Sequence, residues 1–213
     1  MSEAQAAWLD RSHDVSDAEQ LRGLYGWPGG TATSKECDHI HALYRPYIEA
    51  APFAVLATRS PRGLDTSPRG DRPGFVQVAD AHTLLLPDRR GNMRIDSLRN
   101  VLHDPEVALL FLIPGVGEAL RVNGLARIST APALLQRFEV DGQLPRSVLV
   151  IAVKLVFFQC ARAIKRSGLW DAAAQLERSR LPSPGLILQT LSGSIDGAAY
   201  DAALQERQNA TLY

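Results

Sequence analysis

Residues 84–100 place an arginine-rich turn between an apolar strand and a predicted helix. The backbone N–H groups at the start of a helix have no partner within it and lie at the positive end of its dipole. Asn92, Met93 and Arg94 therefore offer amide groups to an anion, beside guanidinium side chains. Helix starts bind phosphate for this reason, so the segment predicts a site for a phosphorylated cofactor.

A second turn of the same kind, residues 67–71 (Ser-Pro-Arg-Gly-Asp), precedes the first by the length of a strand. Arginine presents a planar fork of donors that suits phosphate oxygens. Gly70 and Asp71 are also ordinary turn residues, so a plain turn is the alternative. We expect Arg69 and Arg94 to converge on one phosphate group, and Arg94→Glu to abolish cofactor retention.

Other candidate residues have an ordinary structural explanation as well. Ser97 would lie in the first helical turn, where a hydroxyl is favoured with or without a phosphate. Arg89 and Arg90 are interpreted as a solvated loop pair. Residues 165–167 (Lys-Arg-Ser), followed by Trp170, are either a cofactor or dimer contact or a charge cluster at a helix end.

Metal and hydrolase chemistry are poorly supported. Cys37 and His41 share a helical face, but a structural zinc site needs four ligands, and the other histidines are scattered along the chain, so no metal site is predicted. Residues 115–117 (Gly-Val-Gly) lack the strand–turn–helix setting of a dinucleotide fingerprint and predict a hairpin turn. No nucleophile elbow is present.

Composition narrows the class of protein further. The 213 residues carry 23 basic and 23 acidic side chains, so there is no global field to attract nucleic acid. No apolar run approaches the roughly 20 residues that span a bilayer. Residues 1–5 are acidic rather than basic, which argues against an export signal. With only Cys37 and Cys160, both expected as thiols, we predict a cytoplasmic protein without a membrane anchor.

The hydrophobic pattern predicts a mainly β protein with helices, of the α+β class. A capping pattern at residues 16–19 begins one helix, which Gly26 ends, and a helix over residues 33–48 is kinked or ended early by Pro46. Further helices are expected at residues 94–103, after Thr130 and at residues 196–207. Strands are expected at residues 53–58, 75–78, 83–86, 106–113, 119–129 and 147–159, with a further segment around residues 65–69.

These six strands are mostly neighbours in sequence and suggest a small antiparallel barrel, closed or partly closed, because closure removes exposed edges. We predict one domain over residues 1–213. It would comprise a helical extension (1–50), the barrel (51–170) and a helical tail (171–213).

The stretch from Pro52 to Trp170 resembles the pyridoxamine 5′-phosphate oxidase-like, FMN-binding split-barrel superfamily, and more narrowly a bacterial subgroup of flavoproteins. The resemblance is carried by residues 53–58 (Phe-Ala-Val-Leu-Ala-Thr), 67–71, 73–75 (Pro-Gly-Phe), 86–88 (Leu-Pro-Asp), 91–92, 114–115, 120–124 (Leu-Arg-Val-Asn-Gly), 160–163, 166–167 and 169–170.

The resemblance implies a six-stranded split barrel and an obligate homodimer with FMN in a groove between the subunits. The flavin phosphate would be held by Ser67, Arg69, Asn92 and Arg94. The backbone of Leu86, Pro87 and Asp88 would follow the pyrimidine edge of the flavin, and residues across the interface would close the site. The complete set of predicted cofactor-binding residues is Ser67, Arg69, Gly70, Asp71, Leu86, Pro87, Asp88, Asn92, Met93, Arg94, Ser97, Arg121, Lys165, Arg166, Ser167 and Trp170.

The expected activity is an FMN-dependent oxidoreductase that acts on a small-molecule substrate. The Arg-x-Val-Leu-Leu-Lys strand of the true oxidase is missing, and its Ser-Arg-Lys triplet is replaced by Asn92-Met93-Arg94. Pyridoxamine phosphate is therefore not assigned as the substrate. Two alternatives stay open: a flavin-binding or redox-sensing protein without turnover, and a split barrel that uses haem, with His39 or His41 as axial ligand, or a deazaflavin.

Overall fold

The computed structural model describes residues 10–213, which divide into two compact units at a boundary between Lys35 and Glu36. The first unit contains α2 (Ala18–Tyr25) and α3 (Gly30–Thr33). Asp17 caps α2 by accepting hydrogen bonds from the N–H groups of Glu19 and Gln20, and Gly26, with a φ of +70°, ends it as predicted. Residues 1–5, on which the prediction of no export signal rests, lie outside the described residues.

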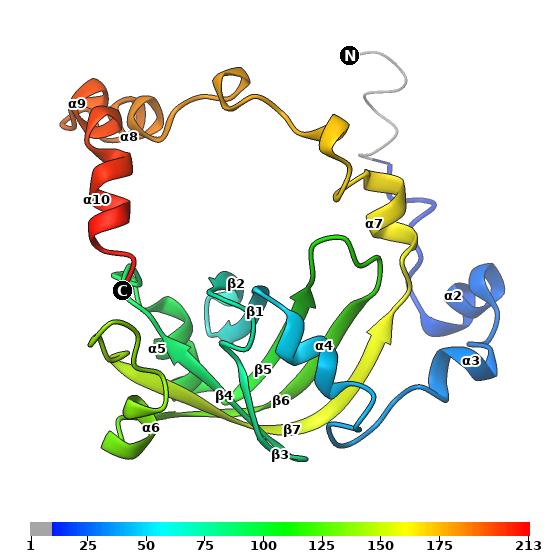
Figure 1. Cartoon of the computed structure of the whole chain (residues 1–213). Helices are drawn as coiled ribbons and strands as arrows, with labels where there is room; N and C mark the ends of the chain where they lie inside the picture. Colours follow the sequence, from blue (N-terminus) through cyan, green and yellow to red (C-terminus); the bar gives the residue numbers. More distant parts are fainter. Residues whose placement is uncertain (1–9) are drawn as a thin grey trace. The chain divides into compact units, whose positions relative to one another are not determined.

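The second unit is built on one antiparallel sheet of seven strands (Figure 1). The strands lie in the order β2-β1-β5-β6-β7-β4-β3. Their bounds are β1 (Phe53–Ser60), β2 (Gly63–Gly70), β3 (Gln77–Asp80), β4 (Thr83–Asp88), β5 (Glu106–Leu112), β6 (Ala119–Ser129) and β7 (Ser147–Gln159). Among the described residues β2 and β3 each pair on one side only, so the sheet is open.

The prediction of a six-stranded closed or partly closed barrel is therefore corrected to a seven-stranded open sheet. The additional strand is β2, of which the sequence indicated only a segment around residues 65–69. Residues 67–70 belong to this strand rather than to a turn. Pro68 is compatible with this strand because β2 lies at the edge of the sheet. One side of an edge strand forms no backbone hydrogen bonds with a neighbour, so a residue without an N–H is tolerated there.

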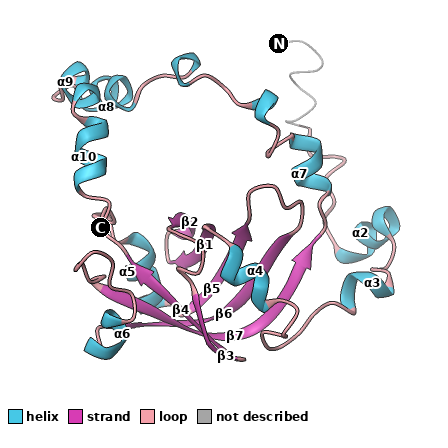
Figure 2. Cartoon of the chain, viewed as in Figure 1, coloured by secondary structure: helices cyan, strands magenta, loops and turns pink. Residues whose placement is uncertain are grey.

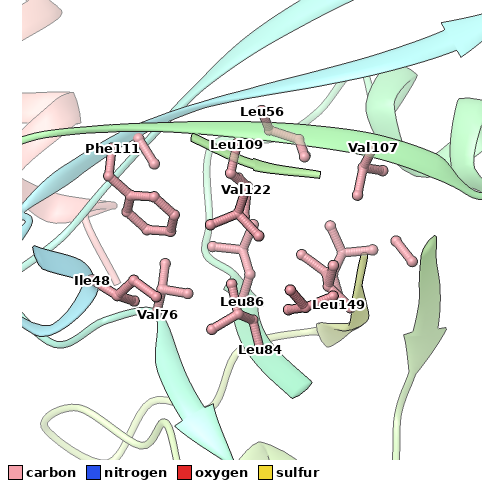
Figure 3. Close-up of a cluster of buried hydrophobic side chains, with 14 of the residues drawn as sticks. Ile48, Leu56, Val76, Leu84, Leu86, Val107, Leu109, Phe111, Val122 and Leu149 are labelled. Atoms are coloured by element: carbon pink, nitrogen blue, oxygen red, sulfur yellow. The ribbon is translucent and has the colours of Figure 1, made fainter. Parts of the chain in front are cut away.

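The hydrophobic core lies between two halves of the curved sheet (Figure 3). Leu56, Leu109, Phe111 and Val122 of β1, β5 and β6 face Leu84, Leu86 and Leu149 of β4 and β7 across the core. Alternate residues of β1 and β5 are buried, as expected for strands with one face on the core. The core thus fixes which face of each strand is available for a site.

Helices precede the strands in sequence, lie between them and follow them (Figure 2). Before and within the sheet region they are α4 (Arg45–Ala50), α5 (Asp96–His103) and α6 (Pro132–Gln136). After β7 they are α7 (Arg162–Ser167), two short 3-10 turns (Ala172–Ala174 and Arg178–Arg180), α8 (Pro184–Ser192), α9 (Gly197–Ala202) and α10 (Leu204–Ala210). No helix within residues 10–213 is both long and apolar enough to cross a bilayer.

Two of the predicted helices differ from the structure. The helix predicted over residues 33–48 is replaced by α4, and Pro46 lies in the first turn of α4, where its missing N–H removes no helical hydrogen bond. Cys37 instead forms an isolated bridge to Val156 of β7. The helix predicted over residues 196–207 is divided into α9 and α10 at Ala203.

Candidate anion-binding site

The ends of β2 and β4 meet, although these strands lie far apart in the sheet order. Arg69, near the end of β2, donates from Nη1 to Oδ1 of Asp88, the last residue of β4, over 2.8 Å. Nη2 of Arg69 donates to Oγ of Ser97 in the first turn of α5. The curvature of the sheet and the start of α5 therefore bring three sequence-predicted residues into direct contact.

The loop after β4 extends this network. Asn92 donates from Nδ2 to Oδ1 of Asp88 over 2.8 Å, and its Oδ1 accepts the N–H of Ile95 over 3.1 Å. The side chains of Arg69 and Asp88 are only 9% and 6% exposed. A buried ion pair offsets its desolvation cost only when its remaining donors and acceptors are satisfied.

One donor of this network has no partner. Nε of Arg69 is the only fully buried side-chain nitrogen or oxygen in residues 10–213 without a hydrogen bond. Leaving such a donor unpaired costs free energy, more for a charged group than for a neutral one.

A second ion pair lies beside the first. Arg89 donates from Nε to Oδ2 of Asp71 over 2.8 Å and from Nη1 to the carbonyl of Phe138. The hydroxyl of Tyr213 donates to Oδ1 of Asp71 over 2.7 Å. This hydrogen bond is the main reason why the pKa of the Tyr213 phenol is raised above its ordinary value. Burial of the phenol is the second cause. The interpretation of Arg89 as a solvated loop residue is wrong, because its side chain is 17% exposed and paired.

Both pairs border a cavity of about 360 Å³. Arg69, Arg89 and Arg90 line it together with Ser67 and Asn92, and none of the described residues that line it is acidic. Asp71 and Asp88 contact two of these arginines but are not among the lining residues. The cavity therefore presents cationic and polar donors to its content, which is the chemistry that binds an anion.

Arg94 does not reach this cavity. Its side chain is 87% exposed, pairs with Asp96 over 2.6 Å, and lines a different cavity together with the β1–β2 turn and residues of α5. Within a single chain, Arg69 and Arg94 line different cavities, so the structure does not show the expected convergence on one phosphate. The helix starts at Asp96, two residues later than predicted, after Ile95 adopts a left-handed conformation with a φ of +49°.

The amide groups predicted to face the anion are also arranged differently. The N–H of Met93 donates to the carbonyl of Gly91 over 3.0 Å, so it is not available to a ligand. The Met93 side chain is exposed, whereas Leu86 is buried in the hydrophobic core. Gly70 ends β2 with an ordinary negative-φ backbone, and its neighbour Asp71 is the partner of Arg89.

The predicted residues of the later segments lie outside the cavity of Arg69. Arg121 donates from Nε to Oδ1 of Asn123 over 3.1 Å and lies over the ring of Phe157. Lys165, Arg166 and Ser167 form the end of α7, and Nε1 of Trp170 donates to the carbonyl of Val116 over 2.7 Å.

Tyr213 is the contact that sequence reasoning missed entirely. It lies 142 residues from its partner Asp71, and no local motif connects the two. Arg90 was interpreted as solvated, and although it is exposed, it lines the cavity. Within residues 10–213 no group of three or more His, Cys, Asp or Glu side chains is arranged to hold a metal ion.

Comparison of the sequence with known protein families identifies one matching family. The sequence model of the family described as pyridoxamine 5′-phosphate oxidase matches residues 40–160, more than half of the chain. No curated protein matches. The matched residues include the whole sheet and the cavity of Arg69, but not α10 or Tyr213.

Solved structures resemble the chain only distantly. HupZ from Group A Streptococcus is 17% identical, and the match covers 57% of this chain and 94% of that chain with a TM-score of 0.47. General Stress Protein 26 from Bacillus anthracis is 16% identical over 54% of this chain and 93% of that chain, with a TM-score of 0.39. The FAD binding protein from Mycobacterium smegmatis is 13% identical over 57% and 95%, with a TM-score of 0.39.

Proposed function

Because this chain belongs to the pyridoxamine 5′-phosphate oxidase family, we propose that it is a flavoprotein that binds FMN and serves as an oxidoreductase for a small substrate. The cavity lined by Arg69, Arg89 and Arg90 would hold the flavin phosphate. The observation that carries the proposal is the buried, unpaired Nε of Arg69 beside a cavity with no acidic lining residue.

The charges at the cavity suit a phosphate monoester. Three arginines line it, and two of them are paired with Asp71 and Asp88, which leaves one net positive charge (3 − 2 = 1). A dianion is attracted to such a site, while the two ion pairs hold Arg69 and Arg89 in place before the ligand arrives. Ser67 and Asn92 add a hydroxyl and an amide to the same lining.

The edge of β4 supports a place for the flavin ring. β3 pairs with β4 only along residues 83–85, so no strand within residues 10–213 covers the β3 side of residues 86–88. We assign the backbone of Leu86, Pro87 and Asp88 to the pyrimidine edge of the ring. When bound, FMN supplies the hydride or electron transfer itself, and the protein binds and orients it. No acid or base from this chain is assigned to that step.

The proposed assembly is a homodimer in which the partner completes each site. This would bring Arg121 and the segment from Lys165 to Trp170 of one subunit to the cavity of the other. Their position outside the cavity within one chain is consistent with such an arrangement.

The absorbance spectrum of the freshly purified full chain tests the proposal. We expect a flavin spectrum, or its appearance after incubation with FMN and gel filtration. A colourless protein that takes up no FMN would overturn it, and a Soret band would identify haem instead. Anaerobic mixing of the loaded protein with NADH or NADPH then separates the two flavin functions: bleaching that reverses in air supports an oxidoreductase, and inert flavin supports a binding protein without turnover.

A further inference from the structure

A second cavity shares a wall with the cavity of Arg69. It has a volume of about 240 Å³ and lies between the loop after β4, Arg146 and residues of the α10 region, Arg207, Gln208 and Thr211. Arg89, Arg90, Gly91 and Asn92 line both cavities. We refer to this second space as the α10 cavity.

The lining of the α10 cavity is strongly cationic. Arg89, Arg90, Arg146 and Arg207 line it, and Asp88 is its single acidic lining residue. Oδ1 of Asp88 already accepts hydrogen bonds from Arg69 and Asn92, and the Asp88 side chain is only 6% exposed. Arg89 is already paired with Asp71, and Asp88 with Arg69. The positive side chains left without an acidic side-chain partner among the described residues at this small space are Arg90, Arg146 and Arg207.

Contacts with the chain hold two of these arginines. The guanidinium of Arg207 lies 4.3 Å from the centre of the Tyr200 ring, in a cation–π contact with α9. Nη1 of Arg90 donates to the main-chain oxygen of Tyr213 over 3.2 Å, and the Tyr213 hydroxyl is itself bound to Asp71. Arg207 has no hydrogen bond or ion pair with an Asp or Glu side chain in residues 10–213, so its guanidinium can bind an external anion, whereas Arg90 is held by Tyr213.

Arg146 is exposed and precedes β7 directly. Its side chain has no hydrogen bond or ion pair with any residue of the described chain, although its backbone N–H donates to the carbonyl of Asp88 over 3.4 Å. That backbone contact keeps Arg146 beside the end of β4 and thus beside the cavity. Its guanidinium is the group in the lining that is most free to move onto a ligand.

We propose that the α10 cavity is an anion site for a phosphate-bearing small molecule distinct from the flavin. Arg90, Arg146 and Arg207 come from three separate segments, which suits a group with three terminal oxygens better than a planar carboxylate. Arg207 lies in α10, outside the residues that match the family. The site shares Arg90 with the cavity of Arg69, but Arg146 and Arg207 line the α10 cavity alone, and its ligand would fasten α10 to the loop after β4.

Calorimetric titration of the full chain with inorganic pyrophosphate tests this site. The chain is first loaded with FMN, so that the cavity of Arg69 is filled. We expect one saturable site, with a dissociation constant that rises at least about tenfold in Arg146→Glu and in Arg207→Glu, as the loss of a charge-assisted hydrogen bond predicts. Arg94→Glu is the matched control, since Arg94 is an exposed arginine that does not line the α10 cavity.

The outcomes separate the two proposals. If the chain takes up no FMN, the same titration of the free chain still reports on the α10 cavity, because neither Arg146 nor Arg207 lines the other one. Absence of saturable binding overturns the α10 site. So does equal weakening in Arg94→Glu, which indicates a general charge effect, or unchanged binding in both cavity variants. Circular dichroism and thermal unfolding of each variant confirm that it is folded.

Discussion

The guanidinium of Arg69 and the carboxylate of Asp88 lie 2.8 Å apart, although their strands share no hydrogen-bonded neighbour in the sheet. β2 pairs only with β1, whereas β4 pairs with β7 and β3. This contact therefore links two strands of the open sheet that are otherwise connected only through β1, β5, β6 and β7. It also places a buried charge pair at the wall of the proposed phosphate cavity.

Removing Arg69 is expected to destabilise the fold strongly. Arg69→Ala leaves the Asp88 carboxylate buried without its charge partner, which costs about 3–5 kcal/mol in the free energy of unfolding. Arg94→Ala removes an exposed ion pair with Asp96 and should cost less than about 1 kcal/mol. Urea unfolding of the two variants measures the difference. If both variants lose the same free energy of unfolding, the Arg69–Asp88 ion pair does not stabilise the fold as a buried pair.

The cavity lining predicts which arginine matters for the flavin. Arg90→Glu places an acid beside the proposed phosphate and should weaken FMN binding at least about tenfold, while Arg90 has no buried partner whose loss would unfold the chain. Arg94→Glu should leave FMN affinity unchanged, the reverse of the expectation from sequence alone. Fluorescence titration with FMN measures both. Should Arg94→Glu lose FMN and Arg90→Glu keep it, the phosphate belongs in the cavity of Arg94.

Gly124 is expected to tolerate no side chain. It lies at a bulge in β6, where a Cβ would come 2.5 Å from the carbonyl oxygen of Ala152 and 2.9 Å from Ile151. Gly124→Ala should therefore lower stability by about 1–3 kcal/mol, as overpacking does. Gly23→Ala in α2 is the control, because open space surrounds Gly23 and alanine favours helix. Thermal unfolding should show a lower Tm for Gly124→Ala alone.

The Tyr213 contact predicts a pH dependence in the alkaline range. The hydrogen bond to Asp71 and burial raise the pKa of the Tyr213 phenol in the folded chain, so folding favours the neutral phenol. This contribution is complete below the pKa of the unfolded chain, about 10, and is lost as the pH rises through the higher folded-state pKa. Stability should fall less steeply over this range in Tyr213→Phe than in the wild type. The free energy of unfolding, measured with urea as a function of pH, checks this prediction. If it falls equally steeply in the two proteins, the Tyr213 contact does not contribute.

Local patterns predicted the strands whose hydrophobic residues alternate, such as β5 and β6, within a few residues of their observed bounds. The same patterns missed β2, because Ser67, Pro68 and Gly70 are typical of turns and the strand is stabilised by pairing with β1. They also placed a helix over residues 33–48, where backbone pairing of Cys37 with Val156 prevails. Contacts between distant segments decided both cases.

For the site, sequence reasoning selected Ser67, Arg69 and Asn92, which the fold brings to one cavity. It grouped Arg94 with them, but Arg94 lines a different cavity and lies before the observed start of the helix at Asp96. It also misinterpreted Arg89, since the acid that pairs with it lies 18 residues earlier and is not part of the same turn. Whether two charges pair depends on the curvature of the sheet, which no short window of residues encodes.

The sheet order has a consequence for the nascent chain. β4, whose residues 84–88 are all buried, pairs on one side with β3 and on the other with β7, which begins only at Ser147. While the ribosome adds the residues between β4 and β7, the only strand that β4 can pair with is β3. A hairpin of two strands alone is marginally stable in water. The insertion of β4 into the sheet must therefore wait for β7, and until then this apolar segment is open to aggregation or chaperone capture.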